Sequence, residues 1–331
     1  MENDFNCSLS YFIFNSFKPH EFYYNCTSND NVGEIQKPLG IYFISSGLFI
    51  LILYTLCLIA MAKSDLMRSS CYKIMMLLGI LDIICTFTNS LATGFLGYEG
   101  ATFCSYPRFI FVMGSIGCGC WIGSCLICVI LGINRCCDMN PNLKIRFIFQ
   151  GSRTYIVIGV ISILTLCETF FTKPFLFNSN YMCWFFDPKL GLKHSYYINK
   201  IHTIVNCCTS ILITTIYLYL CIFLKKKGKI SPSGVVSKVQ RQVFIQSILI
   251  CSFNAIASYI YVYMQLFYSP PFLVLIGQIS WQWSHGSVCV VYLIINRTIR
   301  KRVINLLISE GIQKRIHIGT LQSSSLNAAR S

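Results

Sequence analysis

The chain has 331 residues, of which 54% are hydrophobic and only 12% are charged, and its mean hydropathy is +0.59. A soluble domain carries about 25% charged residues, so this composition excludes an ordinary soluble protein and indicates a membrane protein. The net charge of +15 would suit nucleic-acid binding, but the placement of the charges along the chain favours a topological origin and no nucleic-acid partner.

The first 38 residues are polar and aromatic, and no apolar segment follows a basic start as it would in a signal peptide. We therefore expect the first apolar span to act as the insertion signal and to export residues 1–38 as a short extracellular tail. Two N-x-S/T sequons lie in this tail, at Asn6 and Asn25. Both are predicted glycosylation sites, because sequons are modified only on the outer side of the membrane.

Seven apolar segments of 19 to 25 residues follow, at 39–62, 74–97, 109–133, 154–172, 201–224, 243–267 and 272–295. A helix needs about 20 mainly apolar residues to cross ~30 Å of hydrocarbon. Backbone polar groups in lipid must be paired within the segment, so each span is predicted to be helical. The sequence thus predicts an all-α membrane protein with a seven-transmembrane helix bundle over residues 39–295.

The basic residues predict the orientation of the bundle. With the amino terminus outside, 20 of the 27 Lys and Arg residues fall on the inner side. Cytoplasmic loops are enriched in these residues, and the inner leaflet supplies anionic membrane lipid as a partner. The tail over 296–331 is then cytoplasmic. Ile299, Val303 and Leu307 recur at helical spacing among basic residues, which predicts an amphipathic helix over 296–309, with a frayed stop-transfer segment as the alternative.

Four of the nineteen cysteines lie outside, namely Cys7, Cys26, Cys104 and Cys183, and they allow three pairings. Cys104 comes just before the third span and Cys183 lies in the middle of the long second outer loop. These positions favour a Cys104–Cys183 disulfide, with Cys7–Cys26 as the second choice. The other cysteines are expected to be reduced packing residues.

Asp82 is a carboxylate within the second span, where a charge costs at least ~2.5–3.5 kcal/mol on insertion scales. One interpretation is an intramembrane switch that binds an ion or water cluster or exchanges a proton. The other is a packing residue that hydrogen-bonds to Asn89, Ser124, Ser287 or His285.

Several further residues have both a functional and a structural interpretation. Asn134 and Arg135 come directly after the third span, where it meets the cytosol, and they could bind a cytoplasmic partner or stabilise the helix dipole. Large aromatic residues could form interfacial belts or a ligand pocket, and Glu168 could meet a ligand or be a solvated helix end. The candidates for a pocket in the outer half are Trp121, Glu168, Tyr259, Trp281 and His285.

Catalytic motifs are missing from the sequence. It has no pair of intramembrane aspartates, no Gly-x-Ser-x-Gly, no His-Glu-x-x-His and no phosphate loop. The seventh span has no lysine for a retinal Schiff base. We therefore expect a protein that is not an enzyme and that has no cofactor and no metal site.

Short motifs in a fixed order carry a resemblance to a known family. They are Tyr24-Asn25, Pro38-Leu-Gly, Cys71-Tyr-Lys-Ile-Met, Leu81-Asp-Ile, Gly100-Ala-Thr-Phe-Cys-Ser-Tyr-Pro, Trp121, Asn134-Arg-Cys-Cys-Asp138 and Trp184-Phe-Phe-Asp-Pro. Over roughly residues 22–310 the chain resembles seven-helix G-protein-coupled receptors, and more closely the nematode serpentine chemoreceptors of class T.

The resemblance implies an external small-molecule or peptide ligand, a heterotrimeric G protein inside, and the plasma membrane, including that of a sensory cilium, as the location. It also implies the Cys104–Cys183 loop disulfide, the role of the Asp-Arg-Tyr arginine for Arg135, and that of the second-helix aspartate for Asp82. The chain departs from rhodopsin-like receptors at Asn134, which replaces the acid, and it lacks Cys-Trp-x-Pro and the Asn-Pro before Tyr292.

Two other function classes stay open at this point. A transporter or ion channel would show inverted repeats with broken helices or a polar pore lining. No repeat is visible in the sequence, and the spans hold two acids and no bases. A non-signalling membrane scaffold is the third class.

Overall fold

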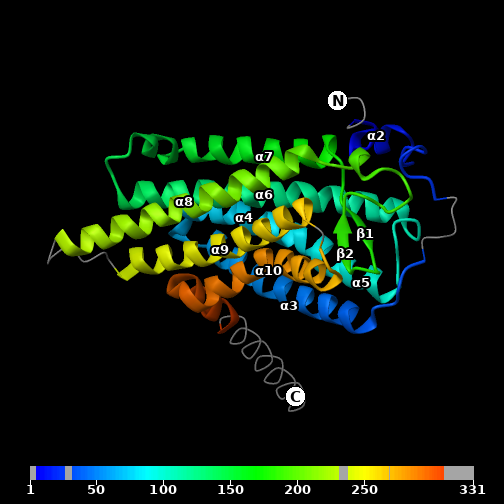
Figure 1. Ribbon diagram of the computed structural model, residues 1–331. Helices are drawn as coiled ribbons and strands as arrows, with labels where there is room; N and C mark the ends of the chain where they lie inside the picture. The colour runs from blue at the N-terminus through cyan, green and yellow to red at the C-terminus, as the bar shows by residue number, and fades with distance from the viewer. Residues whose placement is uncertain (1–4, 27–31, 231–237, 268, 309–331) are drawn as a thin grey trace, which may run out of the picture.

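The computed structural model describes residues 5–26, 32–230, 238–267 and 269–308. Within this part of the chain, the long helices lie side by side in one bundle (Figure 1). They are α3 (Lys37–Ala62), α4 (Ser70–Thr86) with its continuation through the π-helical turn η2 (Phe87–Ala92) into α5 (Thr93–Tyr98), α6 (Pro107–Met139), α7 (Arg153–Phe171), α8 (Lys200–Ile230), α9 (Lys238–Leu266) and α10 (Pro271–Ile295). Short 3-10 helices occur at η1 (Asp65–Arg68), η3 (Lys144–Phe149) and η4 (His194–Tyr196).

Six of the described helices are long and apolar enough to cross a bilayer, and α10 completes the predicted set of seven. α10 has 25 residues, and buried polar side chains such as Gln278, Gln282 and His285 lie in its middle. These side chains face the interior of the bundle, as polar groups in membrane helices normally do. The predicted fold class, a seven-transmembrane helix bundle, is confirmed.

Helix α6 lies at the centre of the bundle, and glycines let its neighbours approach closely. A Cβ atom on Gly119 would lie 1.8 Å from Thr169 Oγ1 of α7, and a Cβ on Gly123 would lie 2.4 Å from Thr165 Oγ1. The sequence therefore places small residues where α6 and α7 make contact.

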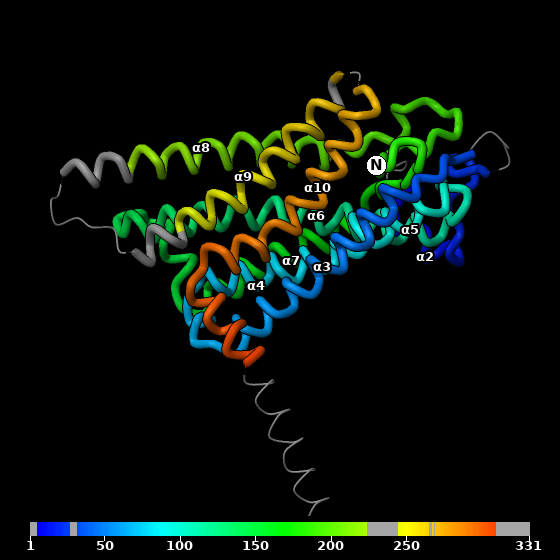
Figure 2. Tube along the Cα trace, turned by 90° about the horizontal axis from the view of Figure 1, so that it is seen from below, coloured from blue at the N-terminus to red at the C-terminus, as the bar shows by residue number. Residues whose placement is uncertain are grey.

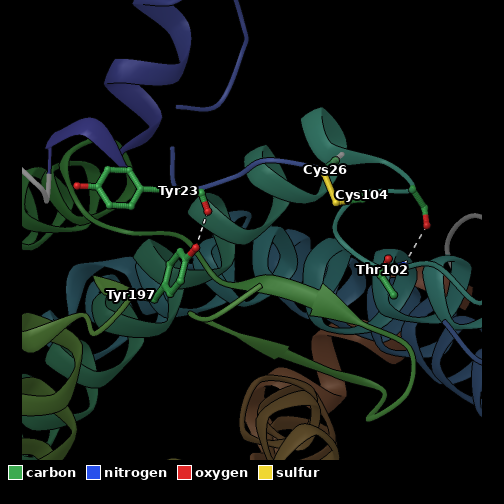
Figure 3. The surroundings of a disulfide bond; sticks show 6 residues. Tyr23, Cys26, Thr102, Cys104 and Tyr197 are labelled. Atoms are coloured by element: carbon green, nitrogen blue, oxygen red, sulfur yellow. Dashed lines mark hydrogen bonds between the residues drawn. A yellow bond between two sulfur atoms is a disulfide. The ribbon is translucent and has the colours of Figure 1, made fainter. Parts of the chain in front are cut away.

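A small hairpin and the amino-terminal tail cover the end of the bundle predicted to face outside. Strands β1 (Leu176–Asn178) and β2 (Cys183–Phe185) pair antiparallel, with Asn178 opposite Cys183. Helix α2 (Leu9–Phe14) packs against α6 and α7 (Figure 1). The tail then crosses the hairpin region, where the Tyr197 hydroxyl donates a hydrogen bond to the Tyr23 carbonyl (Figure 3).

The disulfide joins Cys26 to Cys104, so both predicted pairings, Cys104–Cys183 and Cys7–Cys26, are wrong (Figure 3). The tail passes over the loop before α6 and brings Cys26 to Cys104. Cys183 lies fully buried in β2, where its thiol donates to the Trp184 carbonyl at 3.6 Å. Cys7 is buried beside Tyr24. Spacing along the chain could not reveal this route of the tail.

The chain turns after α10 and is helical over residues 297–308 (Figure 2). Asn296 starts this helix, since its side-chain oxygen accepts from the backbone N–H groups of Thr298 and Ile299, both at 3.1 Å. Ile299 and Val303 are buried, whereas Leu307 is 49% exposed. A short helix is therefore present as predicted, and residue 309, its predicted last residue, lies outside the described residues.

Candidate functional site

The outer half of the bundle contains a cavity of about 470 Å³ between the hairpin loop and helices α8, α9 and α10. This volume lies within the range of pockets for small molecules, ~300–1,000 Å³. Six of its sixteen lining residues are Phe, Tyr or Trp. The lining residues are Phe175, Tyr181, Trp184, Phe185, Phe186, Asp187, Lys189, His194, Ile198, Asn199, His202, Thr203, Tyr261, Met264, Ser269 and Val274.

Aromatic rings pack against one another along one wall of the cavity. The ring of Phe175 lies 4.7 Å from that of Phe186 and 5.2 Å from that of His202. The carboxylate of Asp187 also faces the cavity, but it lies 3.1 Å from His194 Nδ1 and 3.8 Å from Lys189 Nζ. Because basic groups already surround this carboxylate, the cavity suits a neutral and largely apolar molecule better than a cation.

A second layer of aromatic residues lies beneath the cavity. The ring of Trp281 is 5.6 Å from Phe175, and the ring of Trp121 is 5.8 Å from Tyr261. Trp121 also donates through Nε1 to Asn206 at 2.8 Å. The two predicted tryptophans therefore support the cavity-lining residues from below and do not line the cavity themselves.

Asp82 lies deeper and joins four helices. Its Oδ1 atom is 2.6 Å from His285 Nδ1 of α10 and accepts from Ser124 Oγ of α6 at 3.4 Å. Its Oδ2 atom accepts from the Tyr54 hydroxyl of α3. Asp82 is 1% exposed, so these contacts replace the water that a carboxylate normally requires.

The inner end of α6 carries the predicted coupling pair. The side chain of Arg135 is buried, and its Nη1 atom lies 2.9 Å from the carboxylate of Asp138, one turn further along the helix. Asn134 Nδ2 donates to Ser70 Oγ at 3.0 Å. Asp138 therefore pairs with the arginine in place of the acid that is missing at residue 134.

The comparisons with known proteins identify the family. The family model "Serpentine type 7TM GPCR chemoreceptor Srt" matches residues 7–316. The chain belongs to this Srt family. Serpentine receptor class T-55 from Caenorhabditis elegans is 28% identical to it over 294 residues, which are 86% of this chain and 80% of the relative. Squid rhodopsin has the same fold, with a TM-score of 0.56, 12% identity, and coverage of 81% of this chain and 84% of that one.

Membership of the Srt family confirms the predicted resemblance to class T chemoreceptors. It also agrees with the prediction that the chain is not an enzyme, because this is a family of receptors. In the described residues of this Srt receptor, no group of three or more His, Cys, Asp and Glu side chains is arranged to hold a metal ion.

The other pocket candidates of the Srt receptor lie at different distances from the cavity. Tyr259 is 48% exposed at the surface of the bundle, and its hydroxyl lies 2.8 Å from Thr214 Oγ1 of α8. It does not line the cavity. Glu168 is buried, which excludes a solvated helix end. Its Oε1 atom accepts from Asn199 Nδ2 at 3.3 Å, and Asn199 lines the cavity. His285 lies with Asp82, away from the cavity lining.

Two of the four predicted Asp82 partners are correct, and Tyr54 is a partner that was not predicted. Ser124 and His285 are correct. Asn89 instead donates to the Trp281 carbonyl at 3.5 Å, and no hydrogen bond joins Ser287 to Asp82 in the described part of the chain. Tyr54 was missed because a tyrosine in an apolar span gives no sign of the helix that its hydroxyl will face. The cavity residues Phe175, Phe186 and His202 were also missed, although the Trp184-Phe-Phe-Asp-Pro motif includes one of them.

Proposed function

We propose that this Srt receptor detects an external chemical at the plasma membrane and activates a heterotrimeric G protein. The observation that carries the proposal is the aromatic cavity in the outer half of a rhodopsin-like bundle. The ligand that fits it best is a small, largely apolar molecule with a polar group that can meet Asn199 or His202.

The contacts beneath the cavity support transmission through the bundle. Phe175 touches Trp281, Trp121 lies 6.0 Å from the ring of His285, and His285 contacts Asp82. A ligand that binds one arrangement of these side chains better than another would shift the population of receptor states. At the inner end, release of Arg135 from Asp138 would expose a basic group to the G protein.

The experiment is a panel of odorants and peptides applied to cells that express the full chain, with a second-messenger reporter. For an active compound, Tyr261→Ala is expected to raise the half-maximal concentration about tenfold or more, because it removes a large aromatic wall of the cavity. Tyr259→Ala is the matched control on the outer surface of the same helix and should leave the response unchanged. Equal effects of the two variants would contradict the cavity as the ligand site.

Coupling is tested separately with Arg135→Ala. This variant should reach the cell surface and bind the active compound but lose the second-messenger response. Arg153→Ala changes an exposed arginine at the start of α7 and serves as the control. A ligand-induced ion current in a membrane without G protein would instead support the channel class.

A further inference from the structure

Helix α2 of the amino-terminal tail has one buried side and one strongly exposed apolar side. On the buried side, Phe12 is 0% exposed and its ring stacks on Phe111 of α6 at 4.8 Å. On the other side, Phe14 is 84% exposed, Ile13 is 39% exposed, and Phe17 just beyond the helix is 53% exposed. Large apolar side chains at such exposure are unfavourable in water and indicate a non-aqueous environment.

An apolar groove of about 400 Å³ runs between α2 and α7. Ile13 and Phe14 form one wall, and the other includes Ile163, Leu166 and Phe170. The groove is almost entirely apolar, so it offers little to a polar ligand.

The position of the groove along α7 decides which solvent surrounds it. Its α7 wall runs from Ile163 to Phe171, the last residue of the helix. At 1.5 Å per residue this is about 12 Å of helix, which lies within the outer half of a ~30 Å hydrocarbon core. Ile163 is 62% exposed and Leu166 is 55% exposed, so the groove continues directly into the lipid-facing surface of this span.

We propose that α2 lies in the outer membrane interface and that the groove between α2 and α7 binds an acyl chain of an outer-leaflet phospholipid. Amphipathic helices with aromatic side chains on the apolar side bind at this depth. Figure 1 shows α2 beside the end of α7 that lies nearest to β1 and β2. The tail is therefore a membrane-contacting part of the receptor, held to the bundle by the Cys26–Cys104 disulfide.

The test uses the full chain in nanodiscs of phosphatidylcholine that carries a photoreactive diazirine in the middle of one acyl chain. After illumination, peptide mapping by mass spectrometry is expected to find adducts on both walls, at residues 10–14 and 163–171. Phe14→Asp should reduce the adducts on residues 10–14 about tenfold, as expected when a large apolar side chain is replaced by a charged one.

Phe22→Asp is the matched control, because Phe22 is a 56% exposed aromatic residue of the same tail whose ring lies 6.1 Å from Tyr196, away from the groove. Adducts on α7 with none on α2 in the wild-type receptor would overturn the proposal, and so would cross-links from the groove to a second copy of the chain. An intact Cys26–Cys104 link, mapped without reduction, shows that each variant is folded. If Phe14→Asp loses this link, the labelling of the wild-type receptor alone decides.

Discussion

At the scale of single residues, the Asp82 carboxylate depends on groups from three other helices. We expect His285→Leu to lower the thermal midpoint of the purified receptor strongly, because removing one partner of a buried pair costs about 3–5 kcal/mol. The double variant Asp82→Leu/His285→Leu should lose clearly less stability than the sum of the two single variants. Tryptophan fluorescence during heating in detergent measures all three.

Ser287→Ala is the control for this cycle. Its hydroxyl lies two residues from His285, is buried, and has no hydrogen-bond partner among the described residues. Its removal should not lower the stability, because it deletes a buried hydroxyl that forms no hydrogen bond. Additive losses in the double variant would show that Asp82 and His285 do not act as a pair.

The outer cysteines make a second prediction at this scale. Burial raises the pKa of the Cys183 thiol to about 12. Only the thiolate reacts with iodoacetamide, so Cys183 should stay unmodified in the folded receptor at pH 8 and should react faster only as the pH rises toward 12. Mass spectrometry of the unreduced receptor should find the Cys26 and Cys104 peptides linked.

Substitutions also distinguish the Cys26–Cys104 disulfide from the Cys104–Cys183 pairing. Cys104→Ser should destabilise the receptor by about 2–4 kcal/mol, since it opens a link between residues 78 apart in sequence. Cys183→Ser should have a much smaller effect. A linked peptide that contains Cys183 would contradict the structure.

At the scale of elements, hydrophobic length predicted every membrane helix to within a few residues at most ends. The membrane forces each apolar segment to satisfy its own backbone, so local sequence is sufficient there. The hairpin, the tail and the disulfide were not predictable in this way, because they depend on contacts between distant segments, such as Cys26 with Cys104 and Tyr23 with Tyr197. The same holds for the candidate site. The acid in the second span was evident from the sequence, whereas the cavity between the outer loop and helices α8, α9 and α10 was not.

The contact between α6 and the outer loop gives the element-scale prediction. A Cβ on Gly114 would lie 1.7 Å from the Phe175 carbonyl oxygen, so Gly114→Ala must displace the loop that lines the cavity. We expect a lower thermal midpoint, from about 1–3 kcal/mol of overpacking, and a weaker response to ligand. Gly159→Ala is the control, since its Cβ would have open space on α7. A normal ligand response of Gly114→Ala would show that the loop adapts without cost.

At the scale of the whole molecule, the excess of basic residues on one side predicts which face of the bundle meets the cytoplasm. The structure agrees with one orientation of the bundle, since α2 and the hairpin lie at one end and the helix over 297–308 lies at the other (Figures 1 and 2). The cavity lies at the same end as the hairpin, because residues of β2 line it. The seven crossings then leave the amino terminus and the carboxyl-terminal helix on opposite sides of the membrane.

Three natural sequons allow this orientation to be tested without any added tag. Asn25 is exposed and Asn6 is half-buried at the outer end, whereas Asn296 is 2% exposed and caps the inner helix. Glycosyl transfer occurs only on the lumenal side, so glycosidase treatment should increase the gel mobility of the receptor. Asn6→Gln and Asn25→Gln should each remove one step of that shift, and their combination should abolish it. Asn296→Gln should leave the shift unchanged. A glycan on Asn296 would show that the whole bundle has the opposite orientation in the membrane.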